Sequence, residues 1–246
     1  MNSANSAGAP RTPLVLVPGL MCDSAVWEPM LALLAPVVQC QVVDHRSADS
    51  ITTMARQALD AAPHAFALVG HSMGGRVALE MLRLAPQRVL RLALLDTGYR
   101  RRVAGTVGDD EARGRYALLA LARTEGVRAM ASQWVQGMVH PARLADAVLM
   151  GAIVAMFDRS TADTFAHQIH ALLNRPDAAP VLAGLQIPTL VLCGRQDTWA
   201  PVSQHEEIAA LVPGRAALRV VESCGHMSPM EQPVPVAQAL IAWLRC

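Results

Sequence analysis

Short, almost uniformly apolar runs alternate along the chain with longer segments of helical periodicity, and this alternation limits the possible fold more than any other feature. Such runs are typical of strands buried on both faces of a sheet. The alternation predicts a mostly parallel sheet of about six strands, with helices on both of its faces. We predict strands at residues 14–17, 41–43, 66–69, 89–95, 189–193 and 218–222, and helices at residues 24–35, 50–62, 73–85, 203–211 and 234–244.

One long segment interrupts the alternation. Between Tyr99 and about Pro180 no convincing strand is found, and helical patterns cover residues 109–124, 127–138, 141–157 and 161–173. A helical insertion between two parallel strands is expected to cover the carboxyl edge of the sheet, where open α/β sheets bind ligands. We therefore predict a core of residues 13–98 and 181–246, a helical cap of residues 99–180, and a disordered tail of residues 1–12.

The segment Gly70-His71-Ser72-Met73-Gly74 joins a predicted strand to a predicted helix. It matches G-x-S-x-G, the nucleophile elbow, in the strand–turn–helix context that this motif requires. Small residues two positions before and after the serine prevent the strand and the helix from colliding. The turn places the serine at a helix N-terminus, where backbone N–H groups favour a developing oxyanion. We predict Ser72 as a catalytic nucleophile.

A serine nucleophile needs a general base and a group that orients this base. His226 lies in a loop after the last predicted strand and is the predicted base. Asp197 lies in the loop after the strand at 189–193 and is the predicted acid, because Ser72, Asp197 and His226 then follow the chain order of this motif. Asp96, at the end of the strand at 89–95, is a competing candidate for the acid.

An oxyanion hole is expected from two backbone N–H groups. One belongs to Met73, directly after the nucleophile. The other should lie in the loop after the first strand, where Gly19 lets the backbone approach closely and the Leu20 N–H is the predicted donor.

With these motifs the chain resembles alpha/beta hydrolases of the small serine carboxylesterase and enol-lactonase type, which include pimeloyl-ACP methyl ester esterases and 3-oxoadipate enol-lactonases. The resemblance runs from about Pro13 to Leu244. It rests on the Pro18-Gly19 loop followed by Trp27, the GHSMGG elbow, the GRQD loop that carries Asp197, and the segment GHMSPMEQP that carries His226. It implies an α/β-hydrolase fold and ester hydrolysis, and no motif points to one substrate.

The chain departs from the pattern of this family in two places. The family commonly has His-Gly in the oxyanion loop, where this chain has Pro18-Gly19. The family's sheet also begins with two antiparallel edge strands, whereas only about a dozen residues precede Leu14. We therefore expect a sheet that lacks these two strands, with an exposed edge at which a dimer could form, so that both a monomer and a homodimer remain open.

The substrate pocket is expected between the sheet and the cap. Apolar side chains at its predicted wall are those of Met21, Trp134, Met138, Met150, Trp199 and Met227. The helix at 147–157 is apolar on all sides, so we expect it to be buried or to face substrate on one side. The cluster Arg100 to Arg102 is interpreted as a solvated loop, and no arginine or lysine inside a matching motif marks a carboxylate or phosphate clamp.

These residues predict a serine hydrolase that cleaves a small apolar carboxylic ester or lactone through an acyl-enzyme. Carbon–carbon bond hydrolysis and thioester hydrolysis on the same triad remain alternatives, because a fold does not determine its chemistry. A non-catalytic ligand receptor is a third alternative, although such a protein would be free to lose a triad residue.

Composition limits the partners. A formal net charge of +1 offers no basic stripe for nucleic acid. The longest apolar run, at residues 147–157, is too short for a bilayer, which needs about 20 residues. The five cysteines are widely spread and show no C-x-x-C pair, which indicates reduced thiols and neither disulfides nor a zinc site. We expect a cytoplasmic protein that needs no metal or cofactor.

Overall fold

The computed structural model describes residues 12–45, 47–214 and 216–246. The predicted disordered tail lies outside the described residues, apart from Thr12. In the described part, no helix is long and apolar enough to cross a membrane. All five cysteines are free thiols. The expectation of a cytoplasmic location rests on these thiols and stays a prediction.

Six strands form one parallel sheet, which confirms the predicted fold class. The strands are β1 (Leu14–Val17), β2 (Cys40–Val42), β3 (Phe66–His71), β4 (Val89–Leu95), β5 (Thr189–Gly194) and β6 (Ala216–Val221). Their order across the sheet is β2-β1-β3-β4-β5-β6, and every neighbouring pair is parallel. β1, β3 and β5 are buried along their whole length, because helices cover both faces of the sheet.

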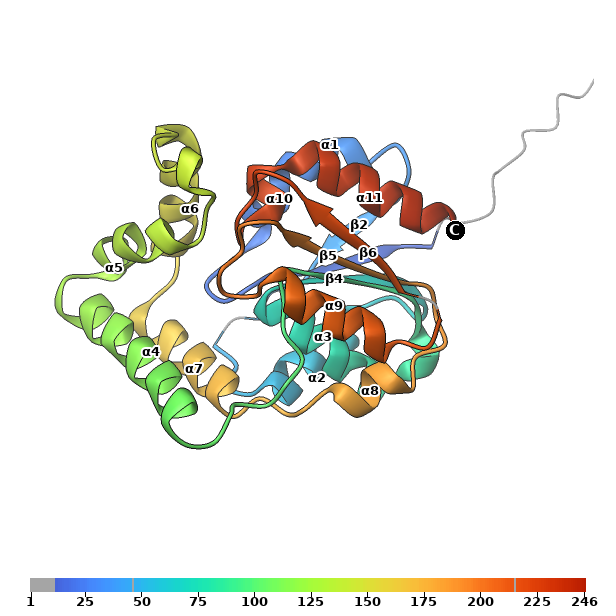
Figure 1. Ribbon diagram of the computed structural model, residues 1–246, viewed down its shortest axis with the longest axis horizontal. Coiled ribbons are helices and arrows are strands. Elements are labelled where there is room, and N and C mark those ends of the chain that lie inside the picture. The colour runs from blue at the N-terminus through green and yellow to red at the C-terminus, as the bar shows by residue number, and fades with distance from the viewer. Residues whose placement is uncertain (1–11, 46, 215) are drawn as a thin grey trace, which may run out of the picture.

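Helices pack on both faces of this sheet (Figure 1). One face carries α1 (Glu28–Leu34) and α11 (Pro233–Arg245), and the short α10 (Ser228–Glu231) lies near them. The other face carries α2 (Ile51–Ala61), α3 (Met73–Leu84), α8 (Ala179–Ala183) and α9 (Val202–Leu211). The sequence patterns predict the long helices among these to within a few residues, whereas α8 and α10 are missed because each covers little more than one turn.

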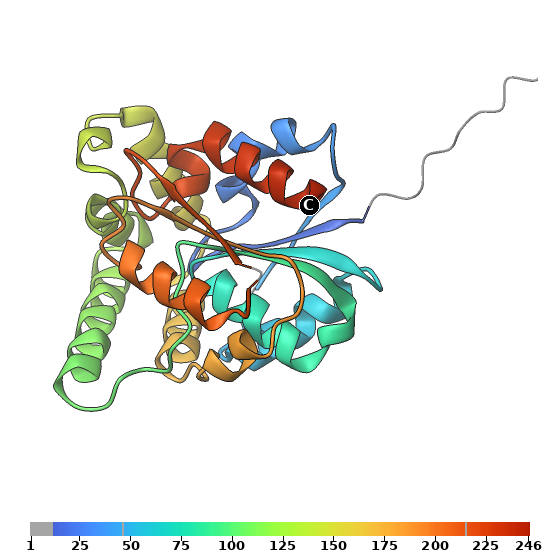
Figure 2. The same cartoon turned by 45° about the vertical axis from the view of Figure 1, so that its right-hand side comes forward.

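Four α-helices between β4 and β5 stand to one side of the sheet in both views (Figures 1 and 2). They are α4 (Thr106–Thr124), α5 (Val127–Trp134), α6 (Ala147–Asp158) and α7 (Ala162–Leu173). We call residues 106–173 the cap. Side-chain caps start its two last helices: Asp146 accepts from the Leu149 N–H at 3.0 Å, and Thr161 accepts from the Thr164 N–H at 3.1 Å.

The sequence predicts that α6 is buried or faces substrate on one side. This prediction is wrong for one face of the helix, which is exposed. Val148 is 84% exposed, and Gly151 and Ala152 beside it are also exposed. The opposite face, with Ile153 and Phe157, is buried. The cap is a single layer of helices at this point, so nothing remains to cover the outer face of α6.

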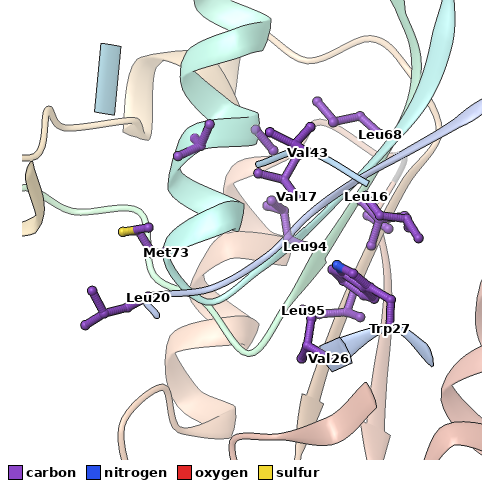
Figure 3. Close-up of a cluster of buried hydrophobic side chains, with 14 of the residues drawn as sticks. Leu16, Val17, Leu20, Val26, Trp27, Val43, Leu68, Met73, Leu94 and Leu95 are labelled. Carbon is purple, nitrogen blue, oxygen red and sulfur yellow. The ribbon is translucent and has the colours of Figure 1, made fainter. Parts of the chain in front are cut away.

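The hydrophobic core continues from the sheet to the elbow (Figure 3). Side chains of β1, β3 and β4 pack together, and the indole of Trp27 is completely buried among them. Its ring meets the imidazole of His71 edge to face, with centroids 6.2 Å apart. The residue before the predicted nucleophile is therefore part of the core.

Two glycines at the elbow allow β3, α3 and β1 to approach one another. A Cβ on Gly70 would lie 2.6 Å from the Cα of Gly75. A Cβ on Gly74 would lie 2.6 Å from the Pro18 carbonyl oxygen and closer still to that of Val17. Because these neighbours are backbone atoms, they have no rotamer with which to move away.

We expect Gly74→Ala to lower the free energy of unfolding by about 1–3 kcal/mol or more. The added Cβ would overlap backbone atoms, which cannot move away by a change of rotamer. Gly151→Ala is the matched control, because a Cβ there meets nothing within 4 Å. This control should raise stability by about 0.5–1 kcal/mol, since alanine is the better residue in the middle of a helix. Urea denaturation of both variants tests the pair, and equal effects would contradict the packing argument.

Candidate active site

Ser72 occupies a strained turn between β3 and α3. Its backbone has φ 54° and ψ −120°, which a non-glycine residue rarely adopts. The turn is held from both sides: the Ser72 N–H donates to the Leu95 carbonyl at 2.9 Å, and the Thr97 hydroxyl donates to the Ser72 carbonyl at 2.6 Å. The geometry is that expected of a nucleophile elbow.

The structure brings the three predicted triad residues together. His226 Nε2 lies 2.8 Å from Ser72 Oγ, and His226 Nδ1 lies 2.8 Å from Asp197 Oδ2. A carboxylate only accepts hydrogen bonds, so Nδ1 carries the proton and Nε2 is left free to accept one from the serine hydroxyl. This is the tautomer in which a histidine can act as a general base.

The competing carboxyl group, Asp96, has other partners. It accepts a hydrogen bond from the Gly194 N–H at 3.0 Å and a short one from the Ser228 hydroxyl. Asp197 bonds His226 through one oxygen, while its other oxygen accepts from the Trp199 and Ala200 N–H groups at 2.9 and 3.0 Å. Of the two candidates, the geometry therefore favours Asp197.

The pKa values of these groups follow from burial and from their neighbours. Burial alone lowers the pKa of His226, but the carboxyl groups of Asp197, Asp96 and Glu231 together outweigh it, with Asp197 first, so the pKa lies above its usual value. Burial likewise raises the pKa of Asp197, yet His226 and the backbone N–H groups bring it below its usual value. For Asp96, burial and the neighbouring charge of Asp197 raise the pKa well above its usual value.

The loop that carries His226 is fixed by buried hydrogen bonds. The His226 N–H donates to the Met138 carbonyl at 2.6 Å, and His71 Nε2 donates to the His226 carbonyl at 2.9 Å. Burial, and then the neighbouring His226, lower the pKa of His71 to about 3, so its ring is neutral. The Glu231 carboxylate accepts from the N–H groups of Gly225, Met227 and His140. Since Met138 and His140 belong to the cap, the cap helps to set the position of the imidazole.

The predicted oxyanion donors lie beside Ser72. Leu20 and Met73 both line the cavity that contains Ser72, and Figure 3 shows their side chains near each other at the edge of the buried cluster. The Met73 N–H is the first of α3 and has no partner within that helix. Among the described residues, the Leu20 N–H has no hydrogen-bond acceptor either. Both groups are thus free to bind an oxyanion.

A side chain from the cap holds the oxyanion loop. Met21, next to Leu20, has a positive φ of 62°, and its N–H donates to Gln168 Oε1 at 2.8 Å. Gln168 is buried and belongs to α7. A second tie joins the same loop to the end of α6, where the Arg159 guanidinium bonds both oxygens of Asp23 at 2.7 and 2.9 Å.

A cavity of about 500 Å³ lies between the sheet and the cap and reaches Ser72 and His226. Four of the six side chains predicted for its wall line it, namely Trp134, Met138, Trp199 and Met227. The rings of Trp134 and Trp199 stack with centroids 5.6 Å apart. Sequence reasoning missed Leu118, Phe157, Phe165 and Leu172, whose helical spacing marks only a buried face.

The prediction for Met21 and Met150 is corrected, because neither belongs to the lining of this cavity. Met21 is buried at a turn whose backbone is held by Gln168. Met150 is half-buried on α6, one position after the buried Leu149. A sequence pattern shows that a methionine is apolar but does not show which side of a helix or turn faces the cavity.

Charged side chains also line the cavity, and sequence reasoning missed them. They are Arg76, Asp110, Glu111, Arg115 and Arg175. The interpretation that no arginine or lysine inside a matching motif marks a carboxylate or phosphate clamp is not tested by these residues, which lie outside the motifs. Arg76 offered a signal, because it lies one helical turn after Ser72, whereas Arg115 and Arg175 come from distant parts of the cap.

The sequence profile of the alpha/beta hydrolase family matches residues 14–239. The chain belongs to this family. Among its curated relatives is the pimeloyl-[acyl-carrier protein] methyl ester esterase of Photobacterium profundum, which is 29% identical over 244 residues and 92% of each chain.

Two solved structures share the fold. One is an esterase from Thermogutta terrifontis in a malate-bound structure, with a TM-score of 0.82, 25% identity, and coverage of 96% of this chain and 90% of that one. The other is the enol-lactonase from Burkholderia xenovorans LB400, with a TM-score of 0.79, 22% identity, and coverage of 96% and 92%. The family and these relatives show that this alpha/beta hydrolase is a hydrolytic enzyme.

For this alpha/beta hydrolase we expect Gln168→Ala to lower kcat on an activated ester by about tenfold and to change KM little, because a displaced oxyanion donor weakens binding of the transition state alone. The control is Gln136→Ala, whose side chain is exposed and bonds the Ser132 carbonyl of its own helical turn. Steady-state kinetics separate the two constants. A purely structural role for Gln168 would instead lower the melting temperature and leave kcat of the folded fraction unchanged.

The triad geometry also predicts a pH dependence. The base must be neutral, so kcat/KM should rise with pH through the raised pKa of His226. Asp197→Asn removes the charge that raises this pKa, so the acid limb should move to lower pH while the rate falls by about two to four orders of magnitude. A pH–rate profile tests both effects. If Asp96→Asn moved the limb and Asp197→Asn did not, the acid would be Asp96.

Proposed function

We propose that this chain is a serine carboxylesterase that hydrolyses a small ester or lactone with an apolar body. The observation that carries the proposal is the continuous hydrogen-bond chain from Ser72 through His226 to Asp197 at the cavity, with 2.8 Å at each step. The name of the Photobacterium relative, a methyl ester esterase, supports the same reaction type.

The reaction follows from the geometry. Ser72 Oγ attacks the ester carbonyl carbon while His226 Nε2 takes the hydroxyl proton, and the carbonyl oxygen becomes an oxyanion that the N–H groups of Leu20 and Met73 stabilise. Collapse of the tetrahedral intermediate breaks the bond to the alcohol oxygen, which receives the proton from His226. A water molecule, deprotonated by the same nitrogen, then attacks the acyl-enzyme and releases the acid and the serine hydroxyl.

The cavity supports an ester with an apolar body. Leu20, Trp134, Phe157 and Phe165 contribute apolar or aromatic surface to the cavity that contains Ser72. A cavity of about 500 Å³ is typical of small-molecule sites. The loop that carries His226 also adjoins the cap, so closing the cap over a substrate would exclude water from the triad.

Other reactions on the same triad are tested by the choice of substrate. One relative, 28% identical and covering 72% of this chain, is named as a 2-hydroxy-6-oxononadienedioate hydrolase. Acyl thioesters and vinylogous diketones are therefore assayed beside esters and lactones. Faster turnover of either class than of every ester would replace the carboxylesterase proposal with that chemistry.

We expect a series of 4-nitrophenyl esters, from acetate to decanoate, to show one preferred chain length with the wild-type protein. Ser72→Ala should reduce turnover by at least about three orders of magnitude, because the acyl-enzyme can no longer form. Circular dichroism checks that the variant is folded. An unchanged rate in folded Ser72→Ala would exclude the proposed nucleophile.

A further inference from the structure

Three arginine side chains line the same cavity as Ser72, although they come from different elements. Arg76 lies on α3, Arg115 lies on α4, and Arg175 follows α7. Arg76 Nη1 and Arg175 Nε both donate to the Arg100 carbonyl, at 2.8 and 3.1 Å. Because they share one acceptor, these two guanidinium groups lie next to each other at the point where the chain enters the cap.

Glu111 neutralises two of the three arginines. Its carboxylate accepts both Nη groups of Arg175, at 2.8 and 2.9 Å, and also bonds Arg115 at 3.0 Å. Arg76 has no such partner: within residues 12–45, 47–214 and 216–246, no carboxylate forms an ion pair with it. It lies beside two paired arginines, with a backbone carbonyl as acceptor on one side only.

The absence of a side chain at Gly98 lets Arg76 and Gln204 pack closely against the backbone there. A Cβ on Gly98 would lie 2.5 Å from Arg76 Nη2 and 2.6 Å from Gln204 Nε2. Gly98 and Gln204 also line the cavity, and Gln204 Nε2 donates to the Thr97 carbonyl at 3.0 Å. Arg76 Nη2 is therefore positioned at this part of the wall, and any larger side chain at position 98 would displace it.

The charge at this end of the cavity is positive. The three guanidinium groups are accompanied there by two carboxylates, Asp110 and Glu111, and Asp110 is paired with Arg113. Glu111 pairs with Arg115 and Arg175, so Arg76 is the guanidinium of this group that lacks a carboxylate partner among the described residues, and one carboxylate would supply it. A phosphate monoester carries a charge of about −1.5 to −2 and would be repelled more strongly by the two acidic groups. Burial, more than the nearby Arg175, lowers the pKa of Arg76 to about 9, which still leaves it charged at neutral pH.

We propose that Arg76, with Arg115 and Arg175 behind it, binds a carboxylate carried by the ester substrate. The planar guanidinium fork matches a carboxylate in geometry, and a charge-assisted hydrogen bond is stronger where the groups are buried away from water. This inference rests on the proposed esterase function and narrows it to acidic esters, such as half-esters of dicarboxylic acids. The apolar wall contacts the chain between the ester group and the acid group.

The spacing of Ser72 and Arg76 along α3 would let one substrate contact both side chains. Arg76 is four residues after Ser72, the N-cap of α3, so the two side chains start about one turn of the helix apart, about 6 Å along its axis. The arginine side chain then extends toward Gly98 and Arg100. A chain of a few methylene groups can therefore reach from the nucleophile to the guanidinium, and a series of diacid half-esters measures the length.

The test compares matched substrates on one protein. Mono-4-nitrophenyl esters of C4 to C8 diacids are compared with 4-nitrophenyl esters of monoacids of the same length, which places the carboxylate on the acyl part. The pair 4-acetoxybenzoate and methyl 4-acetoxybenzoate places it on the alcohol part. We expect the wild-type protein to prefer the anionic member of at least one pair in kcat/KM.

Arg76→Gln should lower kcat/KM for the preferred anionic ester by about 10- to 100-fold, as expected for a lost charge-assisted hydrogen bond. The neutral partner ester should change less than about threefold. Arg123→Gln is the matched control, because it removes one positive charge from the same helix as Arg115 but is exposed and does not line the cavity. This control should keep the anionic preference.

A purely structural role for Arg76 predicts something different. Loss of the tie between α3 and the Arg100 carbonyl would lower turnover of both members of a pair equally, together with the melting temperature. Equal losses, or a wild-type protein that prefers the neutral ester in every pair, would overturn the proposal. Competitive inhibition by inorganic phosphate at concentrations where hexanedioate has no effect would also overturn the assignment to a carboxylate.

A binding measurement separates this inference from the esterase proposal. Calorimetric titration of monomethyl hexanedioate, with dimethyl hexanedioate as the uncharged reference, is carried out on Ser72→Ala and on Ser72→Ala with Arg76→Gln. Tighter binding of the monoacid that depends on Arg76 supports the site even if no ester is hydrolysed. Equal binding of both compounds to both variants contradicts the site, whether or not the protein is an esterase.

Discussion

The strained backbone at Ser72 is the feature on which the rest of the structure depends. A positive φ at a non-glycine residue costs about 1–3 kcal/mol and persists only where the surroundings determine it. Here the strain is held by the carbonyl of Leu95, the hydroxyl of Thr97 and the close packing of Gly74 against β1. The same turn presents Oγ to His226 and leaves the Met73 N–H without a partner in its helix, so one local conformation positions both the proposed nucleophile and a proposed oxyanion donor.

The cap takes part in the site beyond covering it. The Met138 carbonyl, in the cap, accepts a hydrogen bond from the His226 N–H. Gln168, on α7 of the cap, holds the loop that carries Leu20 by accepting the Met21 N–H. Base and oxyanion donor are thus both connected to residues 106–173. A movement of the cap would change the alignment of the triad and the size of the cavity together, which links access of substrate to catalytic competence.

The wall of the cavity combines two kinds of chemistry. Aromatic and aliphatic side chains bury apolar surface of a ligand in a way that depends little on its identity. The charged guanidinium of Arg76 instead offers directional hydrogen bonds to an anionic group. In a buried cavity, a polar group without a partner is costly, so such a contact discriminates strongly between substrates that provide the partner and those that do not. With Arg76 as the proposed carboxylate-binding group, selectivity within this site would depend on charge more than on size.

The sequence by itself determined the six parallel strands, the elbow at Ser72 and the chain order of Ser72, Asp197 and His226, because apolar periodicity and glycine spacing are local properties. Only the tertiary structure placed Asp197, and not Asp96, at hydrogen-bond distance from His226, placed Met21 and Met150 outside the cavity, and gathered Arg76, Arg115 and Arg175 at its wall. Those features depend on contacts between residues that are widely separated along the chain. The direction of each side chain there is set by the packing of whole elements, which no local pattern encodes.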